Sequence, residues 1–376
     1  MDKFLESLNY EAQIAFELRR LYECHGYKKV KVSKFEEYGL YIDNKNFLKT
    51  ENIITFMDLD GKLLALRPDV TLSIVKNLDA KRTASFEKLY YSEKVYRLDK
   101  HNHAYKEISQ MGLECLGSID DCAMIEVLGL AAGSLLAVGE RCVLTVSHIG
   151  FLSGMFEALE LCNETRLAVA QSIKQKNSFE LQQILQDVNL PEAEYQKILQ
   201  IPRLYGNFSE VLAQAQALVL NKTMQNALDE LSILFTAFEG TKLEKHLSLD
   251  FSVVNDLDYY NGIIFQGYIE GIPKAVLAGG RYDNLLRKFG KDKGAVGFAM
   301  YLDELEHYFN QEQEEDADLL VLYDIIDDYK AFAALIDERI ALGQRVRTER
   351  AVPTGFRCKE VTRYSEGKLV REATKC

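Results

Sequence analysis

Apolar residues recur at every third or fourth position over residues 1–24, and this spacing predicts an amphipathic helix. From 27 to 117, short apolar runs alternate with turn residues, which predicts the strands of an antiparallel sheet. The turn DLDG at 58–61 is typical of a hairpin between two such strands. A further stretch with helical spacing predicts a helix at about 120–138.

The middle of the chain has a different pattern. Residues 152–247 have helical spacing throughout, so we interpret them as a helical insertion. Strand-like runs return over 248–310 and end in a helix. The acidic run at 311–318 is interpreted as a linker, and 319–376 as a small α/β domain. Together these patterns predict an α+β fold with its core domain at 1–310.

Composition and charge limit the function classes. The formal net charge of −12 at pH 7 disfavours broad electrostatic binding to nucleic acid. No apolar run reaches the roughly 20 residues of a membrane span, so we expect a cytoplasmic protein. The 7 Cys form no CxxC pair, and His101 and His103 have no neighbouring carboxylate or Cys. Reduced cysteines, no metal site and no cofactor are therefore expected.

Several boxes in this chain resemble, in order and spacing, those of class II aminoacyl-tRNA synthetases. GYKKVKVSKFEEYGLY at 26–41 resembles motif 1, and VYRLDK…YKEISQMGLECLG at 95–117 resembles motif 2. LRPDVT at 66–71, LDYYNG and AGGRYDNL resemble boxes specific to histidyl-tRNA synthetase. GAVGFAMYLDEL at 294–305 stands where motif 3 belongs. The resemblance covers about residues 1–310. It implies an antiparallel sheet flanked by helices.

Two kinds of protein share these boxes: the active synthetase and the synthetase-like regulatory subunit of ATP phosphoribosyltransferase. Adenylation builds negative charge on phosphate oxygens, which arginine stabilises far better than a neutral or acidic side chain. By the resemblance, Arg97 fills the motif 2 arginine position of the former ATP site. Asn255 stands where the histidyl-specific arginine belongs, and Glu304 stands at the motif 3 arginine. These replacements favour a protein without aminoacylation activity.

The amino-acid side of the pocket is better preserved. The resemblance implies that two residues contact the ammonium group of a bound amino acid and one contacts its backbone end. Two more bond the imidazole nitrogens, and one lines the ring. In that order they are Asp69 and Thr71, Gln110, Glu114 and Tyr260, and Tyr282. A histidine ring offers two polar nitrogens, and a buried site must pair both.

We therefore predict a non-catalytic regulatory subunit of ATP phosphoribosyltransferase. The resemblance implies that a short catalytic subunit requires it for activity, and that it serves histidine feedback in the first step of histidine biosynthesis. L-Histidine is the expected effector, bound in the remnant pocket or at a subunit interface. Motif 1, residues 26–41, is the predicted homodimer face within a hetero-oligomer. No tRNA binding is expected, because the region after residue 318 is short for an anticodon-binding domain.

Some readings stay open on the residues alone. The alternatives to a regulatory subunit are an active histidyl-tRNA synthetase and an amino-acid-binding paralogue. Arg67 either braces the LRPDVT turn or binds phosphate. The GGRYD box is either a pocket box or a plain hairpin or bulge with Arg281 and Asp283 paired on the surface.

Overall fold

The computed structural model describes residues 10–44, 53–78, 86–98, 104–186, 188, 190–254, 259–309 and 315–372, without the side chains of 306–309. The chain forms two compact units. One consists of Ile14–Leu305, and the other of Met1–Gln13 together with Glu306–Cys376.

A nine-stranded sheet forms the centre of the larger unit. In spatial order its strands are β1 (Lys28–Lys29), β5 (Phe86–Leu98), β6 (Tyr105–Gly117), β12 (Gly294–Tyr301), β11 (Leu277–Arg281), β10 (Ile263–Ile269), β7 (Cys142–His148), β9 (Leu247–Asp250) and β8 (Tyr205–Asn207). Neighbouring strands are antiparallel except for β1 with β5 and β7 with β9. The predicted α+β class with a large antiparallel sheet is confirmed.

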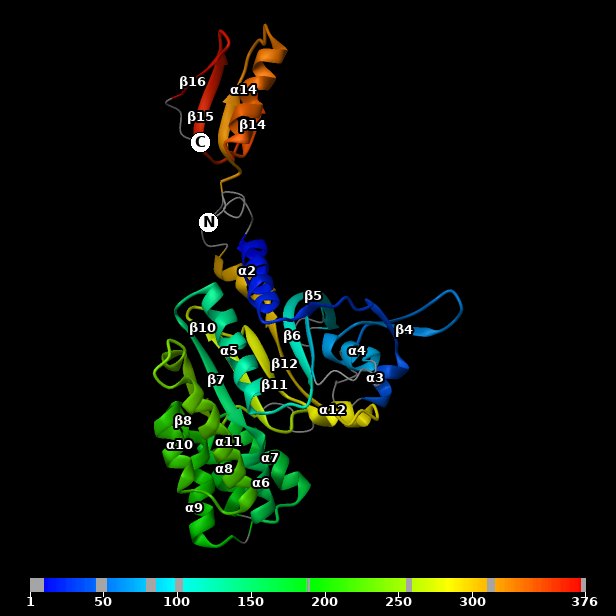
Figure 1. Ribbon diagram of the computed structural model, residues 1–376, viewed down its shortest axis with the longest axis vertical. Coiled ribbons are helices and arrows are strands. Elements are labelled where there is room, and N and C mark those ends of the chain that lie inside the picture. Colours follow the sequence, from blue (N-terminus) through cyan, green and yellow to red (C-terminus); the bar gives the residue numbers. More distant parts are fainter. Residues whose placement is uncertain are drawn as a thin grey trace. The chain divides into compact units, whose positions relative to one another are not determined.

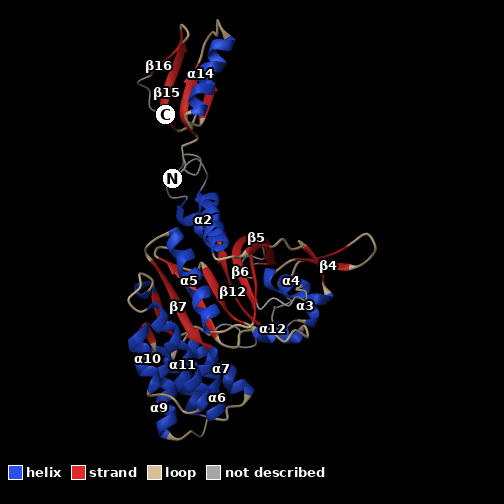
Figure 2. Cartoon of the chain, viewed as in Figure 1, coloured by secondary structure: helices blue, strands red, loops and turns tan. Residues whose placement is uncertain are grey.

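Two helices cover one face of this sheet, α2 (Tyr10–Cys24) and α5 (Asp121–Val138) (Figure 2). Tyr22 of α2 packs edge-on against Phe298 of β12, and its hydroxyl lies 3.0 Å from Ser134 Oγ of α5. Leu135 of α5 packs directly onto Gly267 of β10. Among the described residues, α5 is the one helix long and apolar enough to cross a membrane. These contacts make it a core helix of the sheet domain.

The other face of the sheet is covered by shorter elements, α3 (Gly39–Asp43), α4 (Val70–Asn77) and α12 (Asp283–Lys288). Their apolar side chains form a buried cluster with Tyr91 of β5 and Tyr282. Lys291, just after α12, donates to the carbonyl oxygens of Val75 and Leu78 at the end of α4, with 2.6 Å to Leu78. This lysine places a positive charge and a hydrogen-bond donor at the C-terminal end of α4, where both are favourable.

Helices α6 to α11 gather at one end of the unit (Figure 1). They are α6 (Ile149–Ala158), α7 (Asn163–Lys174), α8 (Ser178–Gln186), α9 (Glu192–Gln200), α10 (Phe208–Gln216) and α11 (Lys222–Phe238). The segment is not helical throughout, because strand β8 lies between α9 and α10 and pairs with β9 of the central sheet. His148 joins the segment to the sheet: its Nδ1 caps α6 at Gly150 N, and its Nε2 lies 3.1 Å from Glu230 of α11.

A separate three-stranded sheet forms from β2 (Phe35–Glu37), β4 (Leu63–Leu66) and β3 (Thr55–Met57). The predicted hairpin lies between β3 and β4, where Asp58 accepts from the amides of Asp60 and Lys62. The strands over 27–117 thus divide between two sheets, whereas one sheet was expected. We attribute this division to Arg67, whose guanidinium donates hydrogen bonds to the carbonyls of Val32 and Ser33. These carbonyls are then not paired with a neighbouring strand, and β1 does not continue into β2.

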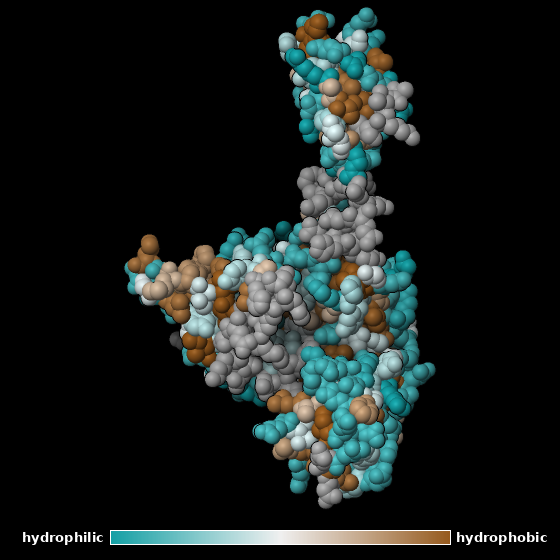
Figure 3. Space-filling view, turned by 180° about the vertical axis from the view of Figure 1, so that it is seen from behind, coloured by the Kyte–Doolittle hydropathy of each residue, from teal (hydrophilic) through white to brown (hydrophobic). Residues whose placement is uncertain are grey.

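This small sheet is a projecting arm with many apolar side chains on its surface (Figure 3). Its exposed large apolar residues are Phe35, Phe56, Met57, Leu59 and Leu63. The rings of Phe35 and Phe56 pack edge to face, with centroids 5.6 Å apart. An apolar surface of this kind is typical of a contact site for another protein.

Within the smaller unit, residues 315–372 form a four-stranded sheet and one helix. The sheet order is β14 (Val346–Glu349), β13 (Ala317–Leu322), β15 (Cys358–Ser365) and β16 (Lys368–Arg371), and α14 (Tyr329–Ala341) packs on one face. Strand β13 begins at Ala317, so the run interpreted as a linker to 318 ends inside this strand. Cys358 is disulfide-bonded, contrary to the expectation that all cysteines are reduced.

Candidate functional site

The candidate site lies on the face of the large sheet opposite to α5. Side chains two residues apart on a strand share a face, so Gln110 and Glu114 of β6 point the same way. Directly across on β12, Tyr301 pairs with Gln110 and Gly297 pairs with Glu114. The remaining positions of this patch on the central strands are small: Gly112, Ala278, Gly280 and Ala299. Gln110 and Glu114 therefore project from a part of the sheet whose neighbouring positions carry glycine or alanine.

Pocket side chains lie directly on two of these glycines. A Cβ on Gly297 would lie 1.9 Å from Glu114 Oε2. A Cβ on Gly280 would lie 2.7 Å from Cδ1 of Tyr260. Only glycine permits these approaches, which explains why the AGGRYDNL box needs Gly280 and the motif 3 box needs Gly297.

Glu114 is the centre of the site. It is 1% exposed, Thr71 Oγ1 of α4 donates to its Oε1 at 2.6 Å, and the hydroxyl of Tyr282 donates to its Oε2. Burial raises the pKa of Glu114 to about 8, and the charge of Asp69 acts in the same direction, while the two hydroxyls oppose it. Ion pairs found over the described ranges include none with Glu114. The carboxyl is therefore mostly protonated near neutral pH.

Asp69 begins helix α4 and faces the same site. Its Oδ1 accepts from the backbone N–H of Leu72 at 2.8 Å, as an N-cap residue does. Burial raises the pKa of Asp69, and the backbone bonds and the charges of Arg97 and Arg67 act against this shift. One oxygen of the predicted ammonium ligand is thus already bonded to its own helix.

Aromatic rings form the wall beside Glu114. The ring of Tyr259 lies 4.6 Å from that of Tyr260 and 5.7 Å from that of Tyr282, centroid to centroid. Burial raises the pKa of Tyr259 and of Tyr282 well above the usual tyrosine value, so both hydroxyls stay protonated. Such a wall suits a flat polar ring, with an apolar face and hydrogen-bonding edges.

Gln110 lies at the other end of the polar row. It is 3% exposed, and its Nε2 has no hydrogen-bond partner among the residues that the structure describes. A buried amide donor without a partner is unfavourable by roughly 1–3 kcal/mol, and a ligand oxygen would satisfy it. Gln110 and Glu114 are four residues apart on β6, or about 13 Å between Cα atoms at the usual rise per residue. That span suits a small ligand with a polar group at each end.

Tyr91 was not identified from the sequence. It lies opposite Gly112 across β5 and β6, and its hydroxyl would lie 2.6 Å from a Cβ on that glycine. Burial raises the pKa of Tyr91 well above the usual value, and the charge of Glu114 adds to this. An aromatic residue cross-strand from a mid-strand glycine is the signal that identifies such a contact, once the pairing register is known.

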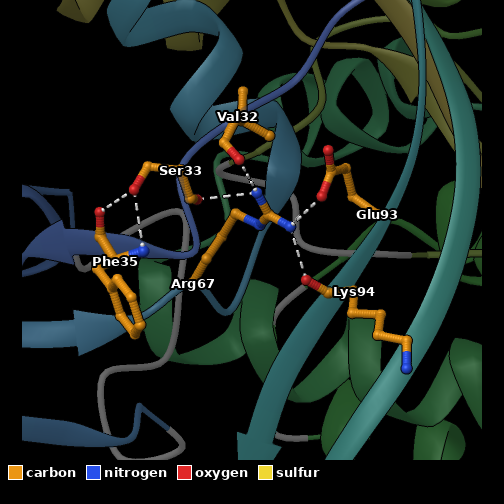
Figure 4. Close-up of polar contacts among 6 residues, drawn as sticks. All are labelled: Val32, Ser33, Phe35, Arg67, Glu93 and Lys94. Carbon is orange, nitrogen blue, oxygen red and sulfur yellow. Dashed lines mark hydrogen bonds and ion pairs between the residues drawn. The ribbon is translucent and has the colours of Figure 1, made fainter.

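Arg67 braces the LRPDVT turn through hydrogen bonds to the neighbouring segments (Figure 4). It is fully buried, and its Nη1 donates to the carbonyls of Val32 and Ser33 at 2.9 and 2.8 Å. Its Nη2 donates to Glu93 Oε2 at 3.0 Å and to the carbonyl of Lys94 at 2.8 Å. The guanidinium therefore ties the motif 1 segment and β5 to the turn that leads into Asp69 and Thr71.

The structure describes two of the three positions that the resemblance assigns to the former ATP site. Arg97 is partly buried, and its Nε donates to the carbonyl of Pro68 at 2.8 Å, close to Asp69. Glu304 lies in the first turn of α13 (Leu302–Phe309), where its Oε1 accepts from Lys274 Nζ at 3.1 Å. Asn255 lies outside the described residues, as do His101 and His103.

Arg281 and Asp283 are paired, but not as a surface pair. Arg281 Nε lies 2.9 Å from Asp283 Oδ2, and Asp283 is buried. The other oxygen of Asp283 accepts from the backbone N–H of Ala295 at 2.9 Å. Asp283 thereby holds β12 next to Tyr282. Within the part of the chain that the structure describes, no group of three or more His, Cys, Asp or Glu could hold a metal ion.

Comparison with known proteins agrees with this geometry. The sequence profile of histidyl-tRNA synthetase matches residues 2–305. A crystal structure of an ATP phosphoribosyltransferase regulatory subunit/histidyl-tRNA synthetase from Bacillus halodurans C superposes with a TM-score of 0.76 at 23% identity, covering 90% of this chain and 88% of that one. Fold and site thus define a protein of the histidyl-tRNA synthetase class.

Relatives in sequence are more specific. The ATP phosphoribosyltransferase regulatory subunit of Clostridium kluyveri is 31% identical over 381 residues, covering 99% of this chain and 94% of the relative. That of Oceanobacillus iheyensis is 30% identical over 305 residues, covering 80% and 75%. The chain belongs to the family of ATP phosphoribosyltransferase regulatory subunits, the histidyl-tRNA synthetase-like proteins with a regulatory role in histidine biosynthesis. The predicted family and regulatory role are confirmed.

A further solved structure is similar in fold. It is the ATP phosphoribosyl transferase (HisG:HisZ) complex from Thermotoga maritima, with a TM-score of 0.61 at 17% identity, covering 78% of this chain and 98% of that chain.

Proposed function

We propose that this protein activates a short-form ATP phosphoribosyltransferase catalytic subunit and makes it responsive to L-histidine, without catalysing aminoacylation. One contrast within the site supports this proposal. Thr71 and Tyr282 bond the two oxygens of Glu114, whereas the motif 3 position is a carboxylate, Glu304. The residues proposed to bind histidine are thus held in a hydrogen-bonded network, whereas the position proposed to face the triphosphate carries a negative charge.

The loss of adenylation follows from charge. A triphosphate needs cations where its negative charge increases in the transition state, and losing one such donor costs about 10²–10³ in rate. Glu304 has the opposite sign, and its pairing with Lys274 also occupies a nearby cation. Histidine-dependent ATP–pyrophosphate exchange tests this directly. We expect none above background, and exchange at a normal synthetase rate would contradict the proposal.

The partner is proposed from the family and from the Thermotoga maritima neighbour, whose name describes a complex of two kinds of subunit. A catalytic subunit that is inactive alone and active after mixing with this chain is the expected result. No increase in phosphoribosyltransferase activity on mixing would contradict it. The proposal includes a cytoplasmic location.

Histidine feedback requires linkage. The ligand must bind one state of the complex more tightly than another, by about 1–3 kcal/mol for a typical regulatory effect. The remnant pocket is the binding place that the geometry favours, because Gln110 Nε2 is buried without a partner. A subunit interface is the alternative, and a Gln110→Ala variant separates the two. Unchanged inhibition by histidine would move the effector to an interface.

A homodimer through the motif 1 region is proposed as well. Strand β2 belongs to the predicted face 26–41, and it lies in the projecting arm with its exposed apolar side chains (Figure 3). Phe35→Asp should shift the mass measured by light scattering from dimer to monomer. Leu167→Asp, at an apolar residue on α7 that is even more exposed than Phe35 (67% against 54%), is the control and should leave the mass unchanged. A dimer that survives Phe35→Asp would contradict this face.

We do not expect the basic run that includes β14 to bind tRNA tightly. Arg347 donates twice to Glu349 Oε1, at 2.9 and 2.7 Å, and Arg345 pairs with Asp318. Guanidinium groups that are already paired with carboxylates contribute little to phosphate binding. A filter-binding titration with tRNA at physiological salt tests this, and a submicromolar Kd would contradict it.

A further inference from the structure

Glu114 is a buried carboxyl without a counter-ion, and this arrangement has a consequence for its ligand. Its two oxygens accept from the hydroxyls of Thr71 and Tyr282, and Oε2 lies against Gly297. Hydroxyl groups solvate a carboxyl but do not neutralise it. A buried carboxylate with no cation beside it is strongly disfavoured, so this side chain takes a proton.

The groups facing Glu114 supply no positive charge. They come from every element packed around it: Asp69 and Thr71 from α4 and its cap, Tyr91 from β5, Tyr259 from the segment before β10, and Tyr282 from the residue before α12. The tyrosines are neutral, and Asp69 adds negative charge.

The arginines closest in the fold have other partners. Arg67 is bonded to Glu93, and Arg281 is bonded to Asp283. Arg97 directs its Nε to the carbonyl of Pro68. None of the ion pairs in the described parts of the chain brings a cation to the Glu114 carboxyl.

We propose that Glu114 is a proton donor to the ligand, so that the site takes up a neutral azole ring and holds it through one shared proton. The proposal rests on the proposed function, because the ring is that of L-histidine. The carboxyl proton goes to the ring nitrogen that has a lone pair. The N–H of the other ring nitrogen donates to the hydroxyl oxygen of Tyr260. Each ring nitrogen then has one partner, and the proton balance is complete with no further reactant.

This arrangement gives the affinity a maximum in pH. Free histidine must be neutral at its ring, so affinity falls below the ring's own pKa of about 6.5. Glu114 must hold its proton, so affinity also falls above its pKa of about 8. Outside this window each pH unit should change Kd by about tenfold, because one proton is gained or lost on binding. A site in which an ionised Glu114 binds the neutral ring would show no fall on the alkaline side, and one in which it binds the imidazolium would already fall above the ring's pKa of about 6.5.

The test is titration calorimetry of the full-length protein with L-histidine between pH 5.5 and 9. Wild type should show the maximum between the two limbs, with uptake of about one proton on binding above pH 8. Glu114→Gln should bind more weakly but keep its affinity above pH 8, because an amide N–H donates to the ring at any pH. Glu270→Gln, an exposed carboxylate paired with Arg141, is the control and should keep the wild-type profile.

A second ligand tests the proposal without any variant. Triazolylalanine has a far less basic ring, so its binding to wild type should lose the acidic limb and keep the alkaline one. Constant affinity for histidine from pH 7 to 9, or an alkaline fall that persists in Glu114→Gln, would overturn the shared proton alone. No histidine binding at any pH would overturn the pocket itself, and the effector site of the proposed function with it.

Discussion

Glu114 and Gly297 pair directly across β6 and β12, and Oε2 of Glu114 lies only 1.9 Å from the position that a Cβ on Gly297 would occupy. Gly297→Ala should therefore displace Glu114 and lower histidine affinity at least tenfold, because the backbone carbonyl oxygen of Leu113 would also lie 2.4 Å from the new Cβ and limits how far it can move. Calorimetry measures this effect. Gly139→Ala is the control, because nothing lies within 4 Å of a Cβ there and its φ of −176° is ordinary extended backbone. Equal effects of the two substitutions would contradict a specific contact.

The raised pKa of Glu114 also predicts how stability depends on pH. The folded protein keeps this proton up to pH about 8, whereas the unfolded chain releases it near 4.5. The stability that the neutral carboxyl contributes is therefore complete below pH 4.5 and is lost as pH rises through 8, at up to about 1.4 kcal/mol per unit. Glu114→Gln should remove this slope.

Chemical unfolding of wild type and Glu114→Gln at pH 5 and pH 8 measures the difference. The variant should gain stability relative to wild type at pH 8. A constant difference between the two proteins at both pH values would mean that Glu114 is already ionised in the folded state.

Arg67→Met should destabilise the larger unit strongly. The substitution leaves Glu93 without its cation and the carbonyls of Val32, Ser33 and Lys94 without their donor. Breaking a buried pair in this way typically costs about 3–5 kcal/mol. Denaturant unfolding measures it. Arg19→Met, which removes an exposed i,i+4 pair with Glu23, should change stability by less than about 0.5 kcal/mol.

Tyr260→Phe should weaken histidine binding while leaving the fold unchanged. The ring that covers Gly280 stays, and only the hydroxyl is lost. One hydrogen bond to a neutral group is worth about 0.5–1.5 kcal/mol, so Kd should rise by about three- to tenfold. Calorimetry at pH 7 gives the affinity, and a thermal melt checks the fold. Unchanged affinity would place the ring nitrogen against another group.

Glu304→Arg alone should not produce adenylation. The substitution restores an arginine at the motif 3 position, but Asn255 is still not an arginine. The activity of sites built from several charges is not recovered one residue at a time. ATP–pyrophosphate exchange of the variant measures this, and any histidine-dependent rate above wild type would show that Glu304 is the main obstacle. The lost pair with Lys274 is partly exposed and should change stability little.

The long elements of the fold were predictable from local pattern. Short apolar runs within 27–117 became the long strands β5 and β6, and the helical spacing at about 120–138 became α5. The division of the strands over 27–117 into two sheets was not predictable. It depends on hydrogen bonds from Arg67 to the carbonyls of Val32 and Ser33, which are far from it in sequence. Local spacing contains no information about which distant strand a short run pairs with.

The candidate site was predictable as a set of residues and not as a network. The boxes pointed to Thr71, Glu114 and Tyr282, but the hydrogen bonds that join them link positions 43 and 168 residues apart. Tyr91 was missed because its role depends on the register of β5 against Gly112. The raised pKa of Glu114 also arises from three-dimensional burial, which sequence spacing does not report.

Lys291 fastens the end of α4 to the segment after α12. The first turn of α4 contains Thr71, and Tyr282 comes directly before α12. Both hydroxyls that donate to Glu114 therefore lie on the two segments that Lys291 connects. Lys291 therefore connects the two segments that carry these hydroxyls. A ligand that moves the two segments apart must also break the Lys291 hydrogen bonds, so a residue remote from Glu114 limits how far the site can widen.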